Sequence, residues 1–373
     1  EEDYNKLDLN PEKVFPQLTK QVEDILSKIK DKFIIVQFAG GQSPLDVPQD
    51  GDWTKKPYDY EHEPLKRHYP IDKAQKFAET FGFEKAYGSY DELLADPNVE
   101  LVYIATPHSL HADQMKLCIQ YGKPVLCEKA FTPNLPQAEE VLSLAREKGV
   151  YIAEALWPRY MPSRWIINDL LAQGVIGEPR MLYSNLCYAV EHKERITKPE
   201  LAGGALLDLG VYVLNFASMV FGDDIVRINS TVELLETGVD RTETITIKYR
   251  DGKMAQLMAS TAFNSDRRCV VYGTKGFLIV DNVNNPAWVE IYDKDHRDKP
   301  IQRIAMPEQI TGYEYEVEAC LRDWNTGVIE PREMPHEQTK MLLHQMDALR
   351  AIWHIKFPFE EKSPFTDMEL IER

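Results

Sequence analysis

Apolar and polar positions in the first 155 residues follow two alternating periods, which predicts strands and helices in turn. An apolar run at 101–105 is followed by a helical stripe that includes Ala112, Met115 and Ile119, and then by a second apolar run at 124–127. Short apolar runs indicate buried strands, and a strand–helix–strand unit of this size requires a parallel sheet.

Polar residues directly follow both of these strands. Thr106, Pro107 and His108 come after the first strand, and Glu128 and Lys129 come at the end of the second. Ligands collect beyond the carboxyl ends of parallel strands, so we expect these residues at a ligand-binding edge. An ammonium group beside a carboxylate can hold a substrate oxygen and pass a proton, although a surface ion pair has the same sequence pattern.

The rest of the first 155 residues continues the pattern, apart from one irregular stretch. We expect helices over 11–30, 70–81 and 135–148, a short helix capped by Ser89, and strands at 33–39, 85–87 and 150–155. Residues 42–69 contain four prolines and no visible period, so we interpret them as an irregular insertion.

After residue 156 the sequence pattern changes to longer strands in which apolar and polar residues alternate. We expect a helix over 162–172, two closing helices over 312–326 and 336–355, and strands at 181–188, 225–235, 242–249, 254–261, 267–272, 277–280 and 288–292. The predicted fold class is therefore α/β. Periodicity predicts a doubly wound parallel sheet over 1–155 and an α+β domain with a mostly antiparallel sheet over 156–373.

The composition of the chain limits the kinds of molecule that the protein is expected to bind. The 373 residues carry a net charge of -17, which argues against a nucleic-acid surface because phosphate binding needs clustered positive charge. No apolar run reaches the length that a membrane span needs, so no membrane partner is expected. The five cysteines are widely spread and include no CxxC pair, which is typical of reduced thiols in a cytoplasmic protein.

A second group of candidate residues lies in the segment Gly203-Gly204-Ala205-Leu206-Leu207-Asp208-Leu209-Gly210-Val211-Tyr212. Asp208 and Tyr212 are four residues apart and face the same way on a helix. A phenol near a carboxylate can exchange a proton with an alcohol or carbonyl, and the preceding glycine pair allows a close approach to a ligand. A capping aspartate and an interface tyrosine are the alternative. His108 and His111 have no third ligand at metal spacing, so no metal site is predicted.

Four motifs resemble the Gfo/Idh/MocA oxidoreductase family. They are Ala-Thr-Pro-His-Ser-Leu-His at 105–111, Glu128-Lys129, Glu-Ala-Leu-Trp-Pro-Arg-Tyr-Met-Pro at 154–162, and the Gly-Gly segment at 203–212. Their order and spacing match from about Pro70 to Phe359, most closely in the branch of dimeric dihydrodiol dehydrogenase and NADP-dependent D-xylose dehydrogenase. Ala130 stands where the family usually has proline after Glu-Lys.

The resemblance implies a nicotinamide-dependent enzyme. Its nucleotide-binding domain, 1–155, would be Rossmann-like but atypical at its N-terminus, and its substrate-binding and oligomerisation α+β domain, 156–373, would have an open sheet. Lys129, Asp208 and Tyr212 would be the catalytic group, with Tyr212 handling the hydroxyl proton, Lys129 polarising the oxygen and Asp208 orienting the substrate. The implied residues around the cofactor, NADP or NAD, are Gly40, Gly41, Thr106, Pro107, His111, Glu128, Lys129, Trp157 and Arg159, the last two at the mouth. The basic pair Lys66-Arg67 hints at NADP.

The family's G-x-G-x-x-A phosphate turn is absent from the N-terminal part of this sequence. In one alignment 33–39 is the first strand and Gly40-Gly41 a degenerate phosphate turn, but Pro44 and Pro48 would break the following helix. In the other alignment 11–30 is the first helix, 33–39 is the second strand, and the first strand is missing. The prolines favour the second alignment.

Two functions from different classes follow. The first is an NAD(P)-dependent oxidoreductase that transfers hydride to or from a sugar, vicinal diol or hydroxycarbonyl, as a homodimer through its C-terminal sheet. The alternative is a non-catalytic relative, a binding or assembly subunit that has lost the phosphate loop. An NAD-assisted glycoside-cleaving enzyme would use the same pocket. The retained Lys129, Asp208 and Tyr212 favour the oxidoreductase.

Overall fold

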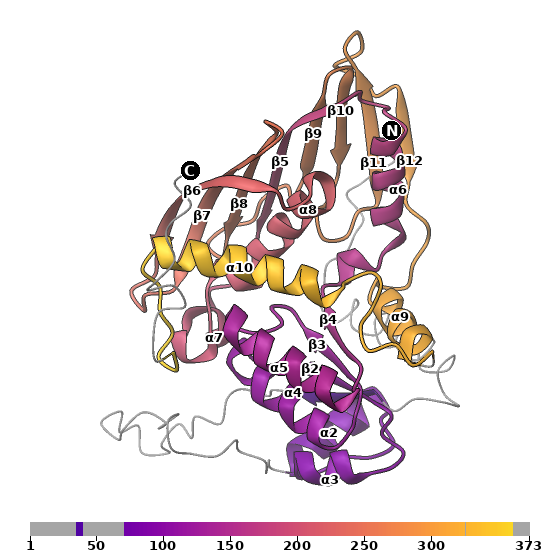
Figure 1. Ribbon diagram of the computed structural model, residues 1–373, viewed down its shortest axis with the longest axis vertical. Helices are drawn as coiled ribbons and strands as arrows, with labels where there is room; N and C mark the ends of the chain where they lie inside the picture. Colours follow the sequence, from indigo (N-terminus) through magenta and orange to yellow (C-terminus); the bar gives the residue numbers. More distant parts are fainter. Residues whose placement is uncertain (1–34, 40–70, 325, 361–373) are drawn as a thin grey trace.

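The computed structural model describes residues 35–39, 71–324 and 326–360, which form two sheets and the helices around them (Figure 1). The first sheet is parallel and its strands follow the chain order: β1 (Ile35–Ala39), β2 (Leu101–Ala105), β3 (Val125–Glu128) and β4 (Ile152–Ala155). The helices along this part are α2 (Ile71–Phe81), α3 (Tyr90–Ala95), η2 (His108–Leu110), α4 (His111–Gln120) and α5 (Leu135–Lys148).

The position of β1 decides between the two N-terminal alignments. β1 pairs in parallel with β2, with Ile35 opposite Leu101. In the order 3-2-1-4-5-6 of a dinucleotide-binding sheet, the strand beside the fourth is the first. Because β2, β3 and β4 correspond to strands four to six, β1 holds the place of the first strand, and the alignment that the prolines favoured is wrong. The helix expected over 11–30 and the insertion over 42–69 lie outside the described residues.

Local sequence signals explain where the helices of this part begin and end. Ser89 caps α3 by accepting the amide of Glu92 at 3.2 Å, and Asn134 caps α5 by accepting the amide of Gln137 at 3.0 Å. Gly149 closes α5 at φ 65°, a left-handed conformation that favours glycine. The expected strand over 85–87 is not formed. Instead Lys85 and Tyr87 both bind the carboxylate of Asp96, just after α3.

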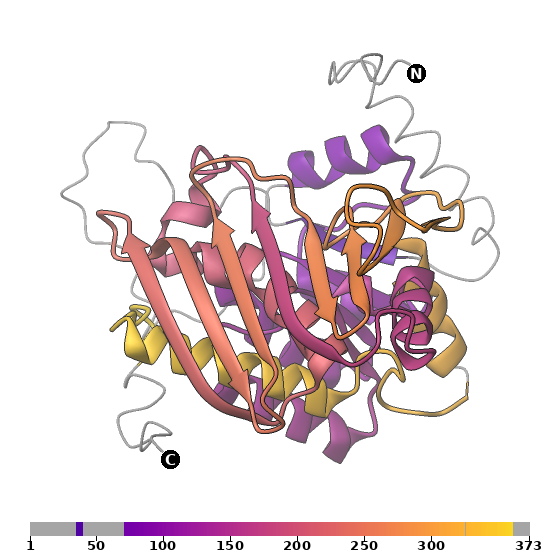
Figure 2. The same cartoon turned by 90° about the horizontal axis from the view of Figure 1, so that it is seen from above.

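The second sheet has eight strands in the order β12-β11-β10-β9-β5-β8-β7-β6 and is mostly antiparallel, with one parallel pair, β5–β8. The strands are β5 (Pro179–Cys187), β6 (Ile225–Leu234), β7 (Asp240–Tyr249), β8 (Met254–Ser260), β9 (Cys269–Gly273), β10 (Gly276–Val280), β11 (Trp288–Asp293) and β12 (Gln302–Ala305). Sequence analysis missed β12. The sheet is open, and Figure 2 shows the face that no described helix covers.

The remaining helices connect the two sheets. They are η3 (Trp157–Arg159), α6 (Pro162–Ala172), α7 (Glu194–Thr197), η4 (Pro199–Leu201), the π-helical turn η5 (Leu206–Gly210), α8 (Val211–Phe221), α9 (Glu314–Trp324) and α10 (His336–Ile352). α8 packs on β5 and β8, and α10 lies between α8 and α5. On the first sheet, α4 packs against β2 and β3, whereas Cys320 of α9 packs on the opposite face with Leu101 and Leu126. One large buried hydrophobic cluster spans the Rossmann-like and α+β parts, and a smaller one lies under α9.

One helical stretch is long and apolar enough to cross a membrane by length and composition, contrary to what the sequence led us to expect. It spans Pro199–Phe221 and includes η4, η5 and α8. Within its most apolar window, 83% is buried inside the protein, as in the core helix of a globular fold.

Candidate active site

Three residues from two distant segments of the chain meet between the two sheets. Lys129 follows the last residue of β3, Asp208 lies in the η5 turn, and Tyr212 lies in the first turn of α8. The Lys129 ammonium donates to Asp208 Oδ1 at 2.9 Å and to the Asp208 backbone carbonyl at 2.7 Å. The same ammonium lies 5.2 Å from the centre of the Tyr212 ring. The structure thus brings together the three residues that sequence analysis expected to be catalytic.

The glycines before Asp208 let its turn pack closely against the protein itself. A Cβ on Gly203 would lie 2.5 Å from the carbonyl oxygen of Ile196, and one on Gly204 would lie 2.2 Å from Oδ1 of Asp240. Gly204 also has φ 119°, which L-residues rarely adopt. Both glycines therefore allow a close approach to the protein's own backbone and to the Asp240 carboxylate, and a close approach to a ligand stays a prediction.

Asp208 is held as a carboxylate by two cations. Burial by itself would raise its pKa, but Lys129 and Arg195 outweigh burial and hold the pKa of Asp208 below its ordinary range. Arg195 of α7 donates to Asp208 Oδ1 at 2.7 Å, although its side chain is 40% exposed. Sequence analysis missed Arg195, which lies 13 residues before Asp208 and belongs to no motif.

Tyr212 lies against an aromatic wall. The indole nitrogen of Trp157 donates to the Tyr212 hydroxyl at 3.0 Å, and Trp157 stacks on Tyr313 with ring centroids 4.6 Å apart. Gly312 makes this stacking possible, because a Cβ there would lie 2.9 Å from the Trp157 ring. Burial raises the pKa of the Tyr212 phenol well above its ordinary value, so the phenol is protonated at neutral pH.

The carboxyl ends of β2 and β3 form the adjoining edge of the site. Thr106 and Pro107 follow β2, and the Thr106 hydroxyl donates to Gln114 at 2.6 Å. Glu128 accepts a hydrogen bond from the hydroxyl of Tyr103, and Lys129 follows it at the Asp208 carboxylate. Tyr103 was not recognised in the sequence because it lies inside an apolar run. The peptide bond from Lys129 to Ala130 is cis.

Two of the residues implied by the resemblance lie behind the site. His111 is fully buried, and its ring nitrogens are each 2.9 Å from a backbone carbonyl oxygen, of Ala130 and of Thr106. Arg159 is 3% exposed and donates to Asn215 and Ser218 of α8. Arg159 therefore does not line the mouth that the sequence led us to expect, and it connects η3 to α8.

His108 lies next to the catalytic group in its neutral form. Its Nδ1 is 2.9 Å from the carbonyl oxygen of Ala202. Burial, helped by His111 and Lys129, lowers the pKa of His108 to about 3. Gly40 and Gly41, expected at the phosphates, and Lys66 and Arg67 lie outside the described residues. Within the described ranges no group of three or more histidine, cysteine, aspartate or glutamate side chains is arranged to hold a metal ion.

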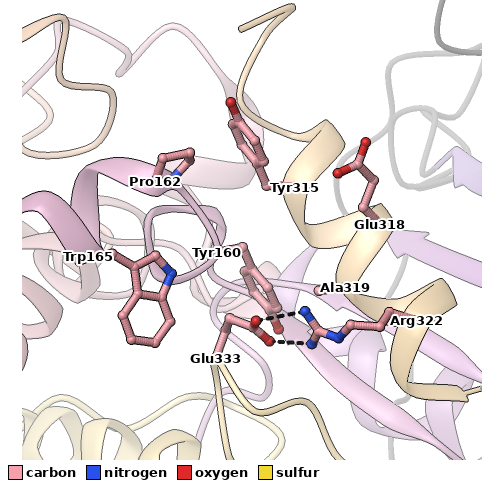
Figure 3. A pocket seen from close by; sticks show the side chains of 8 residues that line it. All are labelled: Tyr160, Pro162, Trp165, Tyr315, Glu318, Ala319, Arg322 and Glu333. Carbon is pink, nitrogen blue, oxygen red and sulfur yellow. Dashed lines mark hydrogen bonds and ion pairs between the residues drawn. The ribbon is translucent and has the colours of Figure 1, made fainter. Parts of the chain in front are cut away.

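A cavity of about 440 Å³ lies apart from these residues, between α6 and α9 (Figure 3). Trp165, Tyr160 and Tyr315 line it on the aromatic side, and its base is the ion pair of Arg322 with Glu333, at 2.8 Å. None of the predicted site residues lines this cavity, so we do not assign the substrate to it.

Comparison with known proteins identifies the family to which this chain belongs. Residues 69–155 match the oxidoreductase family with an NAD-binding Rossmann fold, and residues 166–279 match the Gfo/Idh/MocA C-terminal domain. Trans-1,2-dihydrobenzene-1,2-diol dehydrogenase of Mus musculus is 32% identical over 306 residues, which cover 78% of this chain and 89% of that protein. The corresponding Homo sapiens protein is 31% identical over 299 residues, with 78% and 89% covered.

Among solved structures, KijD10, a 3-ketoreductase from Actinomadura kijaniata in complex with NADP and TDP-benzene, is similar with a TM-score of 0.69 and 26% identity. The match covers 76% of this chain and 86% of that one. Two family models and relatives above 30% identity thus agree with the two-sheet fold. The chain belongs to the Gfo/Idh/MocA family and is an NAD(P)-dependent oxidoreductase.

Proposed function

We propose that Lys129, Asp208 and Tyr212 catalyse the reversible oxidation of a secondary hydroxyl group in a sugar or vicinal diol, or the reduction of the matching hydroxycarbonyl. The observation that carries this proposal is the convergence of the three side chains, with Lys129 Nζ 2.9 Å from Asp208 Oδ1 and 5.2 Å from the Tyr212 ring centre. The relatives named as diol dehydrogenase and 3-ketoreductase support a substrate of this class.

Tyr212 is the proton donor in the direction of carbonyl reduction. Its hydroxyl oxygen accepts from Trp157, so the phenolic proton can point to a substrate oxygen. Burial keeps the phenol protonated by raising its pKa. In the opposite direction the tyrosine must accept the alcohol proton, and the nearby ammonium of Lys129 favours the resulting phenolate.

Lys129 orients and polarises the substrate oxygen. An ammonium has three N–H donors, and two of these go to the carboxylate and carbonyl of Asp208. The third remains for the oxygen that gains or loses the hydride. Asp208, kept ionised by Lys129 and Arg195, fixes the direction of the ammonium and can accept from a neighbouring substrate hydroxyl.

The residues at the carboxyl edge of the first sheet fit a nicotinamide nucleotide. Glu316 of α9 is 1% exposed at this edge, and its Oε2 has no hydrogen-bond partner, which suits a polar ligand group. Thr106, Pro107, Glu128 and Lys129 would hold the nicotinamide end, with Trp157 beside it. When bound, NADP or NAD supplies the hydride acceptor or donor. Gly40 and Gly41 remain the proposed phosphate contacts, and Lys66 with Arg67 the basic pair for a 2′-phosphate.

The stacked pair of Trp157 and Tyr313 would contact the substrate. Tyr313 is 42% exposed, whereas Trp157 is buried beside the Tyr212 hydroxyl. Flat aromatic surfaces pack well against the apolar face of a sugar ring or a cyclic diol.

A homodimer through the open face of the eight-stranded sheet is part of the proposal. The exposed ring of Tyr272 and the half-buried rings of Phe277 and Tyr292 lie together on that face, and Phe277 stacks on Tyr292 at 4.5 Å. We expect no nucleic-acid or membrane partner and a cytoplasmic location. All five cysteines are free and buried, as in a reducing compartment.

Titration of the purified chain with NADPH and NADH, followed by nicotinamide fluorescence and calorimetry, tests the function. Saturable binding in the micromolar range, followed by turnover of a sugar or diol, is the expected result. Tyr212→Phe and Lys129→Ala should each lower kcat by about 10²-fold or more while leaving nucleotide binding measurable. If neither nucleotide binds at millimolar concentration, the dehydrogenase proposal fails and the non-catalytic relative takes its place.

A further inference from the structure

The face of the first sheet that α9 covers leads to Glu316, a carboxyl group that takes no part in the proposed proton and hydride transfer. Side chains alternate between the two faces of a strand. Leu101 and Leu126 pack with α9, so Tyr103 and Glu128, each two residues further on, lie on the same face nearer the carboxyl ends. This face therefore ends in a phenol and a carboxyl group that are hydrogen-bonded to each other.

The direction of α9 brings Glu316 to the same place. Cys320 of α9 interacts with the Tyr151 hydroxyl, just before β4 begins, so this turn of α9 lies toward the amino ends of the strands. Glu316 is one turn earlier on the same side of the helix and thus lies toward the carboxyl ends. Its electrostatic interactions with Glu128 and Tyr103 agree with this position.

Glu316, which is buried, and Glu128, which is half-buried, form a pair of carboxyl groups on this face. Glu316 is 1% exposed, and its Oε2 has no hydrogen-bond partner. Burial and then Glu128 raise the pKa of Glu316 well above its ordinary value. Burial also raises the pKa of Glu128, although Lys129 and the Tyr103 hydroxyl oppose the effect. Two like charges in one buried site do not both persist, so the pair retains one proton at neutral pH.

We propose that Glu316 is a further residue of the cofactor site, and that the proton shared by Glu316 and Glu128 is needed for binding the nicotinamide riboside half of NAD(P). This rests on the proposed placement of that half at Glu128. A protonated carboxyl group beside an ionised one offers a donor and acceptors together. Hydroxyl and carboxamide groups, such as the riboside carries, need both.

Most of the other titratable groups that face the pair change protonation outside the neutral range, but Glu154 of β4 interacts with Glu128, and burial raises its pKa to about 7. Tyr103 of β2, Tyr160 after η3 and Tyr313 before α9 are phenols whose pKa values burial raises. Burial likewise raises the pKa of the Cys320 thiol. The cation beside the pair is Lys129, whose ammonium already binds Asp208. If the pH dependence of nucleotide binding near neutrality disappears when Glu316 is replaced, it therefore arises from the Glu316–Glu128 pair.

The test compares Glu316→Gln with Glu318→Gln in the full-length chain. Both variants remove one carboxyl group from α9, but Glu318 is exposed and points away from the sheet, into the cavity of Figure 3. The dissociation constants of NADH and NADPH are measured by fluorescence between pH 6 and 9. For wild type and Glu318→Gln, loss of the shared proton should weaken binding by up to about tenfold per pH unit, the limit for one proton.

Glu316→Gln carries a permanently neutral group and should lose this pH dependence. The titration of the nucleotide's own phosphate affects all variants equally, so it cancels when their dissociation constants are compared at each pH. Equal pH dependence in Glu316→Gln and wild type would overturn the inference while leaving the proposed function intact. Failure of wild type to bind either nucleotide would overturn both.

Calorimetry in two buffers of different ionisation enthalpy measures the number of protons that the wild type takes up or releases when it binds the nucleotide. This second measurement does not depend on whether Glu316→Gln folds. Binding at alkaline pH should take up a proton. Binding without proton exchange at any pH from 6 to 9 would contradict the shared proton.

Discussion

Trp157 donates its indole N–H to the hydroxyl oxygen of Tyr212 at 3.0 Å, so the proposed proton donor is oriented by a residue from the other side of the site. A donor at the phenol oxygen stabilises the phenolate, and this hydrogen bond opposes the rise in the Tyr212 pKa that burial causes. Trp157→Phe keeps the ring that stacks on Tyr313 and removes only the donor.

We therefore expect the Tyr212 pKa to rise further in Trp157→Phe. Alcohol oxidation, which needs tyrosine as the proton acceptor, should slow by about five- to tenfold, the effect of one hydrogen bond. Carbonyl reduction should change less. Initial rates in both directions across the pH range measure this, with Trp165→Phe, an exposed tryptophan on α6, as control. Equal losses in the two directions would show that Trp157 acts by packing alone.

Arg195 is expected to set the acidic limit of activity. Asp208 keeps its pKa low because Lys129 and Arg195 outweigh its burial. Removing one cation in Arg195→Ala raises that pKa, so Asp208 becomes protonated at a higher pH and releases Lys129. The acid limb of the kcat profile should move to higher pH, while the alkaline limb stays in place. Arg180→Ala, which removes an exposed ion pair with Glu178, is the control and should move neither limb.

The sequence predicted the parts of the site that lie inside local motifs. Glu128 and Lys129 end a strand, and the spacing of Asp208 and Tyr212 puts both on one helical face, so neighbouring residues were enough to identify them. The strands β2 to β4 and most of the second sheet followed from apolar periodicity in the same way.

Residues that reach the site through tertiary packing carried no such signal. Glu316 is polar at a buried position of α9, and only the partner strands reveal why it is there. Arg195 lies in the four-residue helix α7 and Tyr313 just before α9, and neither position belongs to a periodic pattern or motif. The place of β1 also depended on pairing with β2, some 66 residues away, from Ile35 to Leu101, which proline positions alone could not indicate.

Gly204 should tolerate no side chain, because its Cα lies against the Asp240 carboxylate. Gly204→Ala combines the strain of a positive φ with a Cβ 2.2 Å from Asp240 Oδ1. Gly238→Ala is a matched control, since Gly238 has φ 89° but open space around its Cα. We expect about 1–2 kcal/mol of destabilisation from strain in the control and about 1–3 kcal/mol more from overpacking in Gly204→Ala. Urea unfolding measures both, and equal losses would contradict the steric argument.

Glu243 is expected to make the folded state less stable as the pH rises. It is fully buried on β7, neither carboxyl oxygen has a hydrogen-bond partner, and burial followed by Asp240 raises its pKa well above the ordinary value. The folded chain keeps a proton that the unfolded chain releases above about pH 4.3, so the free energy of unfolding falls as pH rises from there.

Glu243→Gln removes this titration. The melting temperature of the variant should exceed that of the wild type by an amount that grows from pH 5 to pH 8. Burial raises the pKa of Asp240 to about 6, and this residue gives the variant a remaining pH dependence of the same sign. A difference in melting temperature that stays constant with pH would mean that Glu243 is ionised in the folded state.

The open face of the second sheet should hold the dimer together. Tyr272 is 45% exposed on β9 and neighbours Phe277, which stacks on Tyr292. A flat aromatic surface on a sheet is a suitable centre for a symmetric interface, because the same patch faces itself across a two-fold axis.

Tyr272→Glu would place two like charges opposite each other in a desolvated contact and should convert the dimer to monomers in sedimentation velocity. Trp165→Glu puts the same charge on an equally exposed aromatic position of α6, away from the sheet, and should leave the dimer intact. A wild-type chain that sediments as a monomer, or a Tyr272→Glu variant that remains dimeric, would assign another role to this face.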